Sequence, residues 1–199
     1  ACGGCALPWS EALREAGLKE QNEVRQSFAP GKPLAVSHGG ASITGTPIER
    51  DGDTLEESCL TVSYVLEFDE SPVPPQVFTC ELTPETFINE LAPARTFAEE
   101  SAYEQFRERG IGGGVTDENA LVVFQDGTIR HPLSQTEVDP RFPDEFARHK
   151  ILDLLGDLAL AGMDLEGKVV AVRSGHQLNT DFAAMVRRTA EKEEAGADE

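Results

Sequence analysis

The first half of the chain alternates between apolar and polar residues, with turn-forming residues between the alternating runs. A period of two places every second side chain on the same face, which is typical of a strand buried on one side. The predicted strands span residues 34–36, 41–49, 59–68 and 76–82, with turns at 37–40 and 51–53. This part of the chain is therefore expected to form a sheet.

Helical patterns flank these strands. Ser10 is a possible N-cap for a helix at 10–25, and the proline- and glycine-containing segment 28–33 then breaks that helix as a linker. Thr83 and Pro84 open a short helix, since threonine can cap the first turn and proline loses no hydrogen bond at the first helical position. A helix-loop-strand pattern follows, with its parts at 99–109, 112–114 and 120–124.

The last third of the chain contains the longest apolar helix. Residues 146–161 are apolar nearly all round, which indicates a buried helix. A valine-rich strand at 168–173 comes next, and Asn179 or Thr180 would cap a final helix at 181–192. Because strands are interleaved with two long helices, we predict an α+β fold, a layered sheet/helix sandwich.

Composition narrows the class of protein. The 199 residues suffice for one core, or for one domain plus a fragment of another. Lys and Arg total 17 against 36 Asp and Glu, and the net charge of −19 argues against a nucleic-acid partner. No stretch approaches the ~20 apolar residues of a membrane span, and the first residues do not resemble a secretory signal. We expect a soluble, cytoplasmic protein.

The four cysteines are too scattered to staple a domain of this size. Cys59 and Cys80 lie in strand-like runs, so we interpret them as reduced thiols in the core. Cys2 and Cys5 have the spacing of a redox or zinc pair, but no second pair follows and no strand leads into them. The cysteines therefore indicate no site of their own.

Side chains with chemistry gather on the apolar helix. His149 and Asp153 are four residues apart and share a helix face, and Asp157 lies one turn further along the same stripe. An imidazole and a carboxylate held in this way can form two corners of a catalytic zinc site. On spacing alone, an ordinary helical pair is the more frequent alternative, with the acids capping neighbouring loops.

Three motifs, in order, resemble those of UDP-3-O-acyl-N-acetylglucosamine deacetylase, the bacterial zinc amidase of lipid A synthesis. The motifs are Ala-Arg-Thr-Phe at 94–97, His-Lys-x-Leu-Asp-x-x-Gly-Asp-Leu at 149–158 and Ser-Gly-His-x-x-Asn at 174–179. The resemblance extends from about Lys32 to Arg188, and residues 11–17 resemble the end of that family's first domain.

The resemblance implies a role for each matching residue. His149 and Asp153 would be two of the three protein ligands of a catalytic Zn²⁺ ion. His176 would be the protonated imidazole that stabilises the oxyanion or donates a proton to the leaving amine. Asp157 would orient that imidazole. The implied reaction removes the acetyl group of UDP-3-O-(3-hydroxyacyl)-N-acetylglucosamine, the committed step of lipid A biosynthesis.

Further residues would hold the intermediate and the substrate. By the same resemblance, Thr96 would hydrogen-bond the tetrahedral intermediate and Lys150 would grip the nucleotide-sugar head, with Arg148 and Arg95 as other possible cations. The helix-loop-strand pattern would be an insert that forms a hydrophobic passage for the fatty acyl chain. The expected substrate-binding residues are Phe97, Tyr103, Phe106, Ile111 and Leu121. An ordinary core position remains an equal interpretation for each residue of the insert.

The chain also departs from the family pattern. The third zinc ligand, a His, and the general base, a Glu beside it, belong to a helix of the family's first domain, and neither is present here. We therefore expect residues 1–32 to be a remnant of that domain plus a linker, 33–190 to be the second, catalytic domain, and 191–199 to be an acidic disordered tail. Such a fragment would be inactive until joined to the missing N-terminal domain.

Two alternatives remain at this point. The chain could be a non-catalytic acyl-nucleotide or protein-binding module that kept the fold and lost the reaction. It could also be a standalone metal hydrolase that completes the zinc shell with water, His38 or a partner chain.

Overall fold

A computed structural model describes residues 4–23, 25–48 and 60–197 of the chain. A five-stranded sheet forms its centre, in the order β2-β3-β9-β4-β5. Its strands are β2 (Leu34–His38), β3 (Ala41–Thr46), β4 (Leu60–Leu66), β5 (Gln76–Glu81) and β9 (Gly167–Val172). β9 pairs antiparallel with β3 and parallel with β4, so the last long strand of the chain lies in the middle of the sheet.

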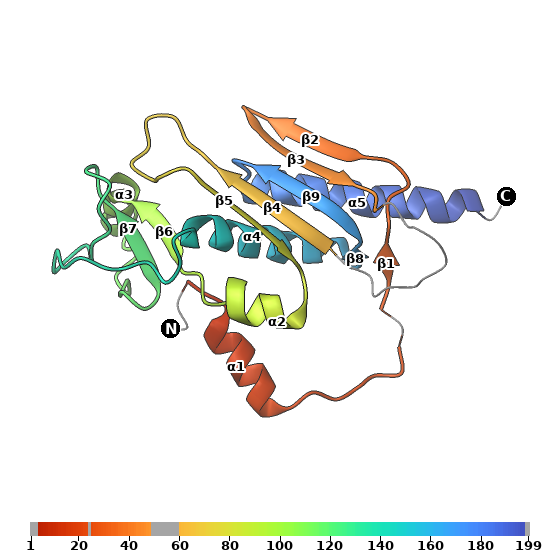
Figure 1. Ribbon diagram of the computed structural model, residues 1–199, viewed down its shortest axis with the longest axis horizontal. Helices are drawn as coiled ribbons and strands as arrows, with labels where there is room; N and C mark the ends of the chain where they lie inside the picture. Colours follow the sequence, from red (N-terminus) through yellow and green to blue (C-terminus); the bar gives the residue numbers. More distant parts are fainter. Residues whose placement is uncertain (1–3, 24, 49–59, 198–199) are drawn as a thin grey trace.

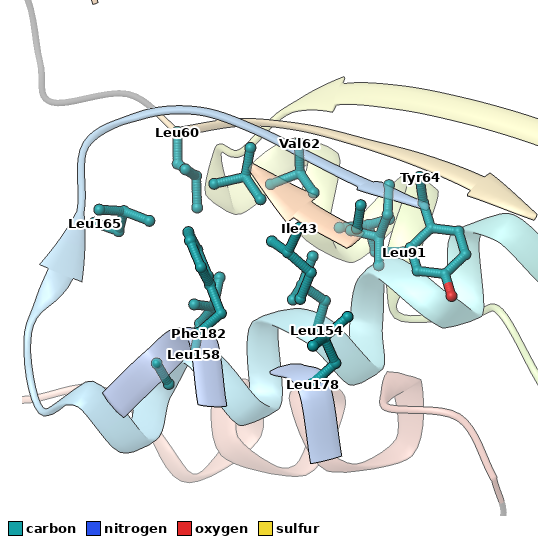
Figure 2. Packing of buried hydrophobic residues seen from close by; sticks show 14 of the residues in the cluster. Ile43, Leu60, Val62, Tyr64, Leu91, Leu154, Leu158, Leu165, Leu178 and Phe182 are labelled. Carbon is teal, nitrogen blue, oxygen red and sulfur yellow. The ribbon is translucent and has the colours of Figure 1, made fainter. Parts of the chain in front are cut away.

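Two long helices, α4 (Glu145–Leu158) and α5 (His176–Ala197), pack against one face of this sheet (Figure 1). The burial of β4 alternates strictly along its length, because only every second side chain faces the helices. Figure 2 shows the resulting core, in which Phe182 of α5 and Leu154 of α4 meet Ile43 of β3 and Val62 of β4. The predicted α+β layered fold is thereby confirmed.

Smaller elements surround the sandwich. They are α1 (Leu7–Ala16), β1 (Ser27–Phe28), α2 (Pro84–Thr86), η1 (Phe87–Leu91), β6 (Thr96–Glu99), α3 (Glu100–Glu108), β7 (Ala120–Val123), η2 (Ala159–Ala161) and β8 (Asp164–Leu165). β6 and β7 form a parallel pair, and α3 connects them at one end of the molecule (Figure 1). This unit is the helix-loop-strand pattern predicted from the sequence.

The start of α2 follows the sequence prediction closely. Thr83 is the N-cap, its hydroxyl accepts from the backbone N–H of Thr86, and the Thr86 hydroxyl accepts from the Thr83 N–H. Pro84 occupies the first helical position. Two otherwise unpaired backbone donors are satisfied, so the turn is fixed by local chemistry alone.

Other boundaries were predicted wrongly. α1 begins at Leu7 and ends before Gly17, whose φ of +84° suits glycine, so the predicted helix at 10–25 is too long and starts too late. Ser10 is not its N-cap, since its hydroxyl donates to the carbonyl of Ala6 from inside the helix.

The final helix also differs from its prediction. α5 starts at His176, so Asn179 and Thr180 lie within its first turns and do not cap it. It continues to Ala197, through most of the segment for which the acidic composition predicted a disordered tail.

The described residues contain no helix long and apolar enough to cross a membrane. Cys5 and Cys80 are buried free thiols, as predicted for Cys80. Cys2, Cys59 and the predicted turn at 51–53 lie outside the described residues.

Candidate active site

The first half of α4 presents the first pair of candidate residues. His149 and Asp153 lie one turn apart, with His149 Nε2 at 3.4 Å from Asp153 Oδ1. On the other side of the ring, His149 Nδ1 lies 3.2 Å from the backbone carbonyl of Ala94. Because a carbonyl can only accept, Nδ1 carries the proton and Nε2 presents its lone pair toward Asp153.

This geometry suits a shared metal ion better than a direct hydrogen bond. An N–H donor and a carboxylate oxygen normally approach to about 2.9 Å. Two ligand atoms at about 2.0–2.1 Å from a tetrahedral zinc ion lie about 3.3 Å apart, which is close to the observed separation. His149 and Asp153 therefore fit two adjacent corners of a zinc shell.

Burial favours the protonation state that a metal ligand needs. The side chain of His149 is 10% exposed. Desolvation lowers the pKa of His149. The charge of Asp153 and the hydrogen bond to Ala94 act to raise this pKa, but desolvation outweighs them. The ring is thus held neutral, with Nε2 available as a ligand.

Lys150 belongs to the same cluster. Its Nζ lies 2.8 Å from Asp153 Oδ2, so the carboxylate uses one oxygen toward the lysine and the other toward His149. Arg148 does not contribute a cation here. It is buried, pairs with Asp144 and Glu90, and stacks over the rings of neighbouring phenylalanines. Lys150 thus pairs with Asp153, whereas Arg95 and Arg148 pair with other carboxylates.

A second imidazole–carboxylate pair joins α4 to α5. His176 Nδ1 lies 2.8 Å from Asp157 Oδ2, and 71% of the histidine side chain is exposed. The Nδ1 contact leaves Nε2 free to meet a substrate. The structure thus brings together His176 and Asp157, as the motif order suggested.

Asn179 supports this second pair, whereas the sequence predicted it to be a helix N-cap. Its side chain is fully buried, and Nδ2 donates to Asp157 Oδ2 at 2.9 Å, the same oxygen that contacts His176. The sequence placed Asn179 outside the helix because asparagine is a common N-cap. The spacing from His176 could have revealed it, since residues three apart share a helix face.

Hydrogen bonds to β4 hold the turn before His176 in place. Tyr64 of β4 donates its hydroxyl to the carbonyl of Ser174 at 2.5 Å, and the backbone N–H of Arg173 donates to the carbonyl of Val65. Burial raises the pKa of Tyr64 to about 12, so the phenol remains a donor at any physiological pH. The start of α5, and with it His176, is therefore fixed to the sheet.

The Ala-Arg-Thr-Phe motif runs along one side of α4. Phe97 packs on Phe146 with ring centroids 4.6 Å apart and meets His149 edge-on at 6.3 Å. Thr96 is half-buried at the start of β6, and its backbone N–H donates to the carbonyl of Gly4. The motif thus reaches His149 through Phe97 and through Ala94, the residue at its start.

The remaining expected substrate-binding residues fall into different environments. Tyr103 is buried in a small apolar cluster with Val122 and Phe124, whereas Leu121 belongs to the main core. Phe106 and Ile111 are 44% and 58% exposed. The two exposed residues are available to a ligand, and the two buried ones match the interpretation as ordinary core.

Among the described residues, no group of three or more His, Cys, Asp or Glu side chains is placed to hold a metal ion. His38 is exposed at the end of β2, and His131 Nδ1 accepts from the backbone of its own turn. Neither histidine joins His149 and Asp153 within this part of the chain, so the described residues offer two candidate metal ligands here.

A large cavity of about 1100 Å³ lies near the other end of α4. It is lined mainly by apolar side chains, among them Leu155 and Leu158 of α4, Leu82, and Phe87 of η1, with Leu13 of α1 at its edge. None of the histidines or carboxylates described above lines it. The cavity is thus separate from the candidate catalytic side chains.

Comparison with known proteins supports the motif resemblance. The sequence pattern of the UDP-3-O-acyl N-acetylglycosamine deacetylase family matches residues 1–188. A UDP-3-O-acyl-N-acetylglucosamine deacetylase of Oleidesulfovibrio alaskensis is 35% identical over 96% of this chain and 57% of its own length. Proteins of the same name from Geotalea uraniireducens and Thermosynechococcus vestitus are 34% and 33% identical over 90% and 92% of this chain.

The match covers nearly all of this chain but not all of its relatives. The chain spans little more than half the length of the curated proteins that it resembles, between 53% and 57% for the first three. The family match includes all three motifs and both imidazole–carboxylate pairs. This chain belongs to the UDP-3-O-acyl-N-acetylglucosamine deacetylase family.

Proposed function

We propose that this chain is the second half of a zinc-dependent deacetylase that removes the acetyl group from UDP-3-O-(3-hydroxyacyl)-N-acetylglucosamine in lipid A biosynthesis. The observation that carries the proposal is the geometry of His149 and Asp153. His149 Nε2 and Asp153 Oδ1, the two atoms that would bind the metal, are 3.4 Å apart. The imidazole is held neutral, with Nε2 facing the carboxylate. The substrate class comes from the relatives, which are UDP-3-O-acyl-N-acetylglucosamine deacetylases by name.

His149 and Asp153 would hold the zinc ion, which supplies Lewis acidity and lowers the pKa of a bound water. His176 would stabilise the oxyanion or donate a proton to the leaving amine through its exposed Nε2. Asp157 holds the ring by Nδ1 and would favour the charged imidazolium in the transition state. Lys150, beside Asp153, would attract the negative head of the nucleotide sugar.

Two further assignments concern the substrate. We propose that Thr96 hydrogen-bonds the tetrahedral intermediate, since the Ala-Arg-Thr-Phe motif runs beside His149. Phe97, which packs edge-on against the His149 ring, would border the reacting group. Exposed Phe106 and Ile111 would contact the acyl chain at the end of the molecule formed by α3 and β7. Tyr103 and Leu121 would shape that region from beneath.

The remaining part of the longer protein would supply the third ligand and the general base. The apolar surface of this chain supports that view. Trp9 and Leu13 on α1 are 59% and 64% exposed, Leu18 is 92% exposed, and the 1100 Å³ cavity opens beside α1. Exposed apolar surface of this kind usually marks a contact region. We propose that the missing half covers it.

The free thiols of Cys5 and Cys80 are consistent with work in a reducing compartment, which we propose to be the cytoplasm.

The test compares this chain alone with the chain joined to the N-terminal part of the Oleidesulfovibrio alaskensis relative. After dialysis, zinc is measured by elemental analysis and acetate release by a coupled assay. We expect the chain alone to lose zinc, because two ligands do not close a tetrahedral shell, and the joined protein to keep about one zinc and release acetate.

The other outcomes identify the alternatives. If this chain alone retains zinc after dialysis and releases acetate, it is a standalone hydrolase. Tight binding of the UDP-acyl-glucosamine by the joined protein, with zinc present but no acetate released, would point to a binding module that has lost the reaction.

A further inference from the structure

A buried ion pair lies beside the candidate site and takes no part in the chemistry proposed above. Glu145, the first residue of α4, is completely buried, and Arg95 is 3% exposed. Arg95 Nε lies 2.8 Å from Glu145 Oε1, and Arg95 Nη2 lies 3.0 Å from Oε2. The two planar groups therefore meet through a pair of parallel hydrogen bonds.

Both side chains also form hydrogen bonds with the surrounding backbone. Glu145 accepts from the backbone N–H of Arg95 and of Arg141, while the guanidinium donates to the carbonyls of Asp117 and Asp139. Burial alone would raise the pKa of the Glu145 carboxyl, but the hydrogen bonds from Arg95 and Arg141 outweigh it and hold the pKa below its usual range. The carboxylate is charged and fully bonded.

Stability alone is a weak explanation for such a pair. The desolvation of two buried charges offsets most of their attraction, and apolar residues of similar volume often serve as well or better. A planar pair with two parallel bonds does, however, fix distance and orientation. The pair can therefore fix the relative position of the segments that carry it.

Those segments belong to the site. Arg95 lies between Ala94, whose carbonyl accepts from His149 Nδ1, and Thr96. Glu145 lies on α4, one helical turn before His149. The Arg95–Glu145 bond thus joins the segment just before β6, whose Ala94 carbonyl contacts His149 Nδ1, to the helix that carries His149. The packing of Phe97 on Phe146 links the same two segments a second time, two residues after Arg95 and one residue after Glu145.

We propose that Arg95 and Glu145 are positioning residues: they hold the Ala94 carbonyl on His149 Nδ1, so that Nε2 is the unprotonated nitrogen and faces the metal position. Neither residue touches the substrate or the metal in this assignment. The part of the proposal that concerns turnover rests on the proposed deacetylase function, whereas the part that concerns the imidazole does not.

The first test uses this chain and the double variant Arg95→Met with Glu145→Leu, which removes both charges together. Ring ¹⁵N–¹H spectra at about pH 8, above the ordinary pKa of histidine, report which nitrogen of His149 carries the proton. In the unaltered chain, His149 should be almost entirely protonated at Nδ1. In the double variant we expect both nitrogens to carry the proton in comparable amounts, with the cooperative unfolding transition retained.

A matched control is the pair Arg130 and Asp126, which is partly exposed and whose side chains also contact Thr128 and Phe124. Arg130→Met with Asp126→Leu should leave the His149 spectrum unchanged. If the apolar double variant does not fold, Arg95→Lys keeps the charge but not the parallel bonds, and should give an intermediate proton distribution. An unchanged His149 spectrum in a folded variant of either design would overturn the proposal.

The second test uses the joined enzyme. Misplacing a catalytic group by about 1 Å can cost on the order of 100-fold in rate, so we expect kcat of the apolar double variant to fall at least about 10-fold, with KM within about 2-fold of its original value. A rise in KM alone would contradict a positioning role. If the unaltered joined protein releases no acetate, the proposed function fails, while the spectra of this chain still decide the role of Arg95 and Glu145.

Discussion

The two imidazole–carboxylate pairs of this protein have the same chemical composition and different surroundings. Both acids lie on one stripe of α4, but His149 shares that helix and is 10% exposed, whereas His176 comes from α5 and is 71% exposed. His149 approaches its acid to 3.4 Å, and His176 to 2.8 Å. One contact is too long for a good hydrogen bond, and the other is a normal one.

The difference shows how burial can adapt two similar pairs to the separate roles proposed for them. In the buried pair, desolvation favours a neutral ring, and the Ala94 carbonyl selects Nδ1 as the nitrogen that carries the proton, which leaves the Nε2 lone pair free, as in an imidazole that binds a metal ion. In the exposed pair, Asp157 contacts Nδ1 and water can reach Nε2, an arrangement that suits the proton transfer proposed for His176. If burial distinguishes the two pairs, substitutions in one pair should have different consequences from substitutions in the other.

The first prediction separates metal binding from turnover in the joined protein. Asp153→Ala should abolish both zinc retention and acetate release, because it leaves a single ligand on this half of the site. His176→Ala should retain zinc and lose at least about 100-fold in kcat, as expected for a group that acts in the transition state. Elemental analysis and initial rates check both variants. If His176→Ala removes the metal while Asp153→Ala keeps it, the two roles are reversed.

The second prediction concerns the free energy of unfolding of this chain. His149→Ala should cost about 2–3 kcal/mol, because it leaves a small cavity and an unpaired carbonyl at Ala94. His176→Ala should cost less than about 1 kcal/mol, since its side chain is mostly in water. Urea denaturation measures both values. Equal costs would mean that burial does not distinguish the two histidines.

The third prediction addresses Asn179, which supports only the exposed pair. Asn179→Ala should cost about 1–2 kcal/mol, because a buried hydrogen bond to the Asp157 carboxylate is lost. Asn179→Asp should cost more, since two carboxylates would then face each other. Gln177→Ala is the control, as its hydrogen bond to Asp181 is exposed, and its effect should lie within about 0.5 kcal/mol. A larger effect for Gln177 than for Asn179 would contradict this account.

The fourth prediction is a pH dependence. The folded state lowers the pKa of His149, so the unfolded chain takes up a proton at higher pH than the folded chain does. Its contribution to stability is therefore fully present above the ordinary histidine pKa of about 6.5 and is lost as pH falls through the folded pKa. The slope attributable to one group cannot exceed about 1.4 kcal/mol per pH unit.

Urea denaturation at a series of pH values measures that slope. His149→Gln should remove part of it, whereas His176→Gln is the comparison on the exposed pair. The assignment of the pH dependence to burial fails if the His149 variant keeps the full slope between pH 6.5 and lower values.

Local patterns in the sequence account for part of this picture. The stripe of His149, Asp153 and Asp157 follows from helical periodicity alone, and the capping of α2 by Thr83 follows from the chemistry of a first turn. These features depend on residues only a few positions apart, so no knowledge of the tertiary fold was needed.

Long-range features could not be found in that way. Arg95 and Glu145 are fifty positions apart. Arginine and glutamate usually lie at the surface, yet here they form a buried pair. Asn179 resembles an N-cap until the start of α5 at His176 places it inside the helix. The sequence also contained no local sign that β9 would pair between β3 and β4.

The central place of β9 determines when this sheet can form during synthesis. Residues 41–46 and 60–66 leave the ribosome about a hundred residues before 167–172, and until then β3 and β4 each lack a partner along one edge. Unpaired edges of this kind can associate with other chains. A chain released before residue 167 would expose both edges, so premature termination late in translation should produce an aggregating product rather than a smaller folded one.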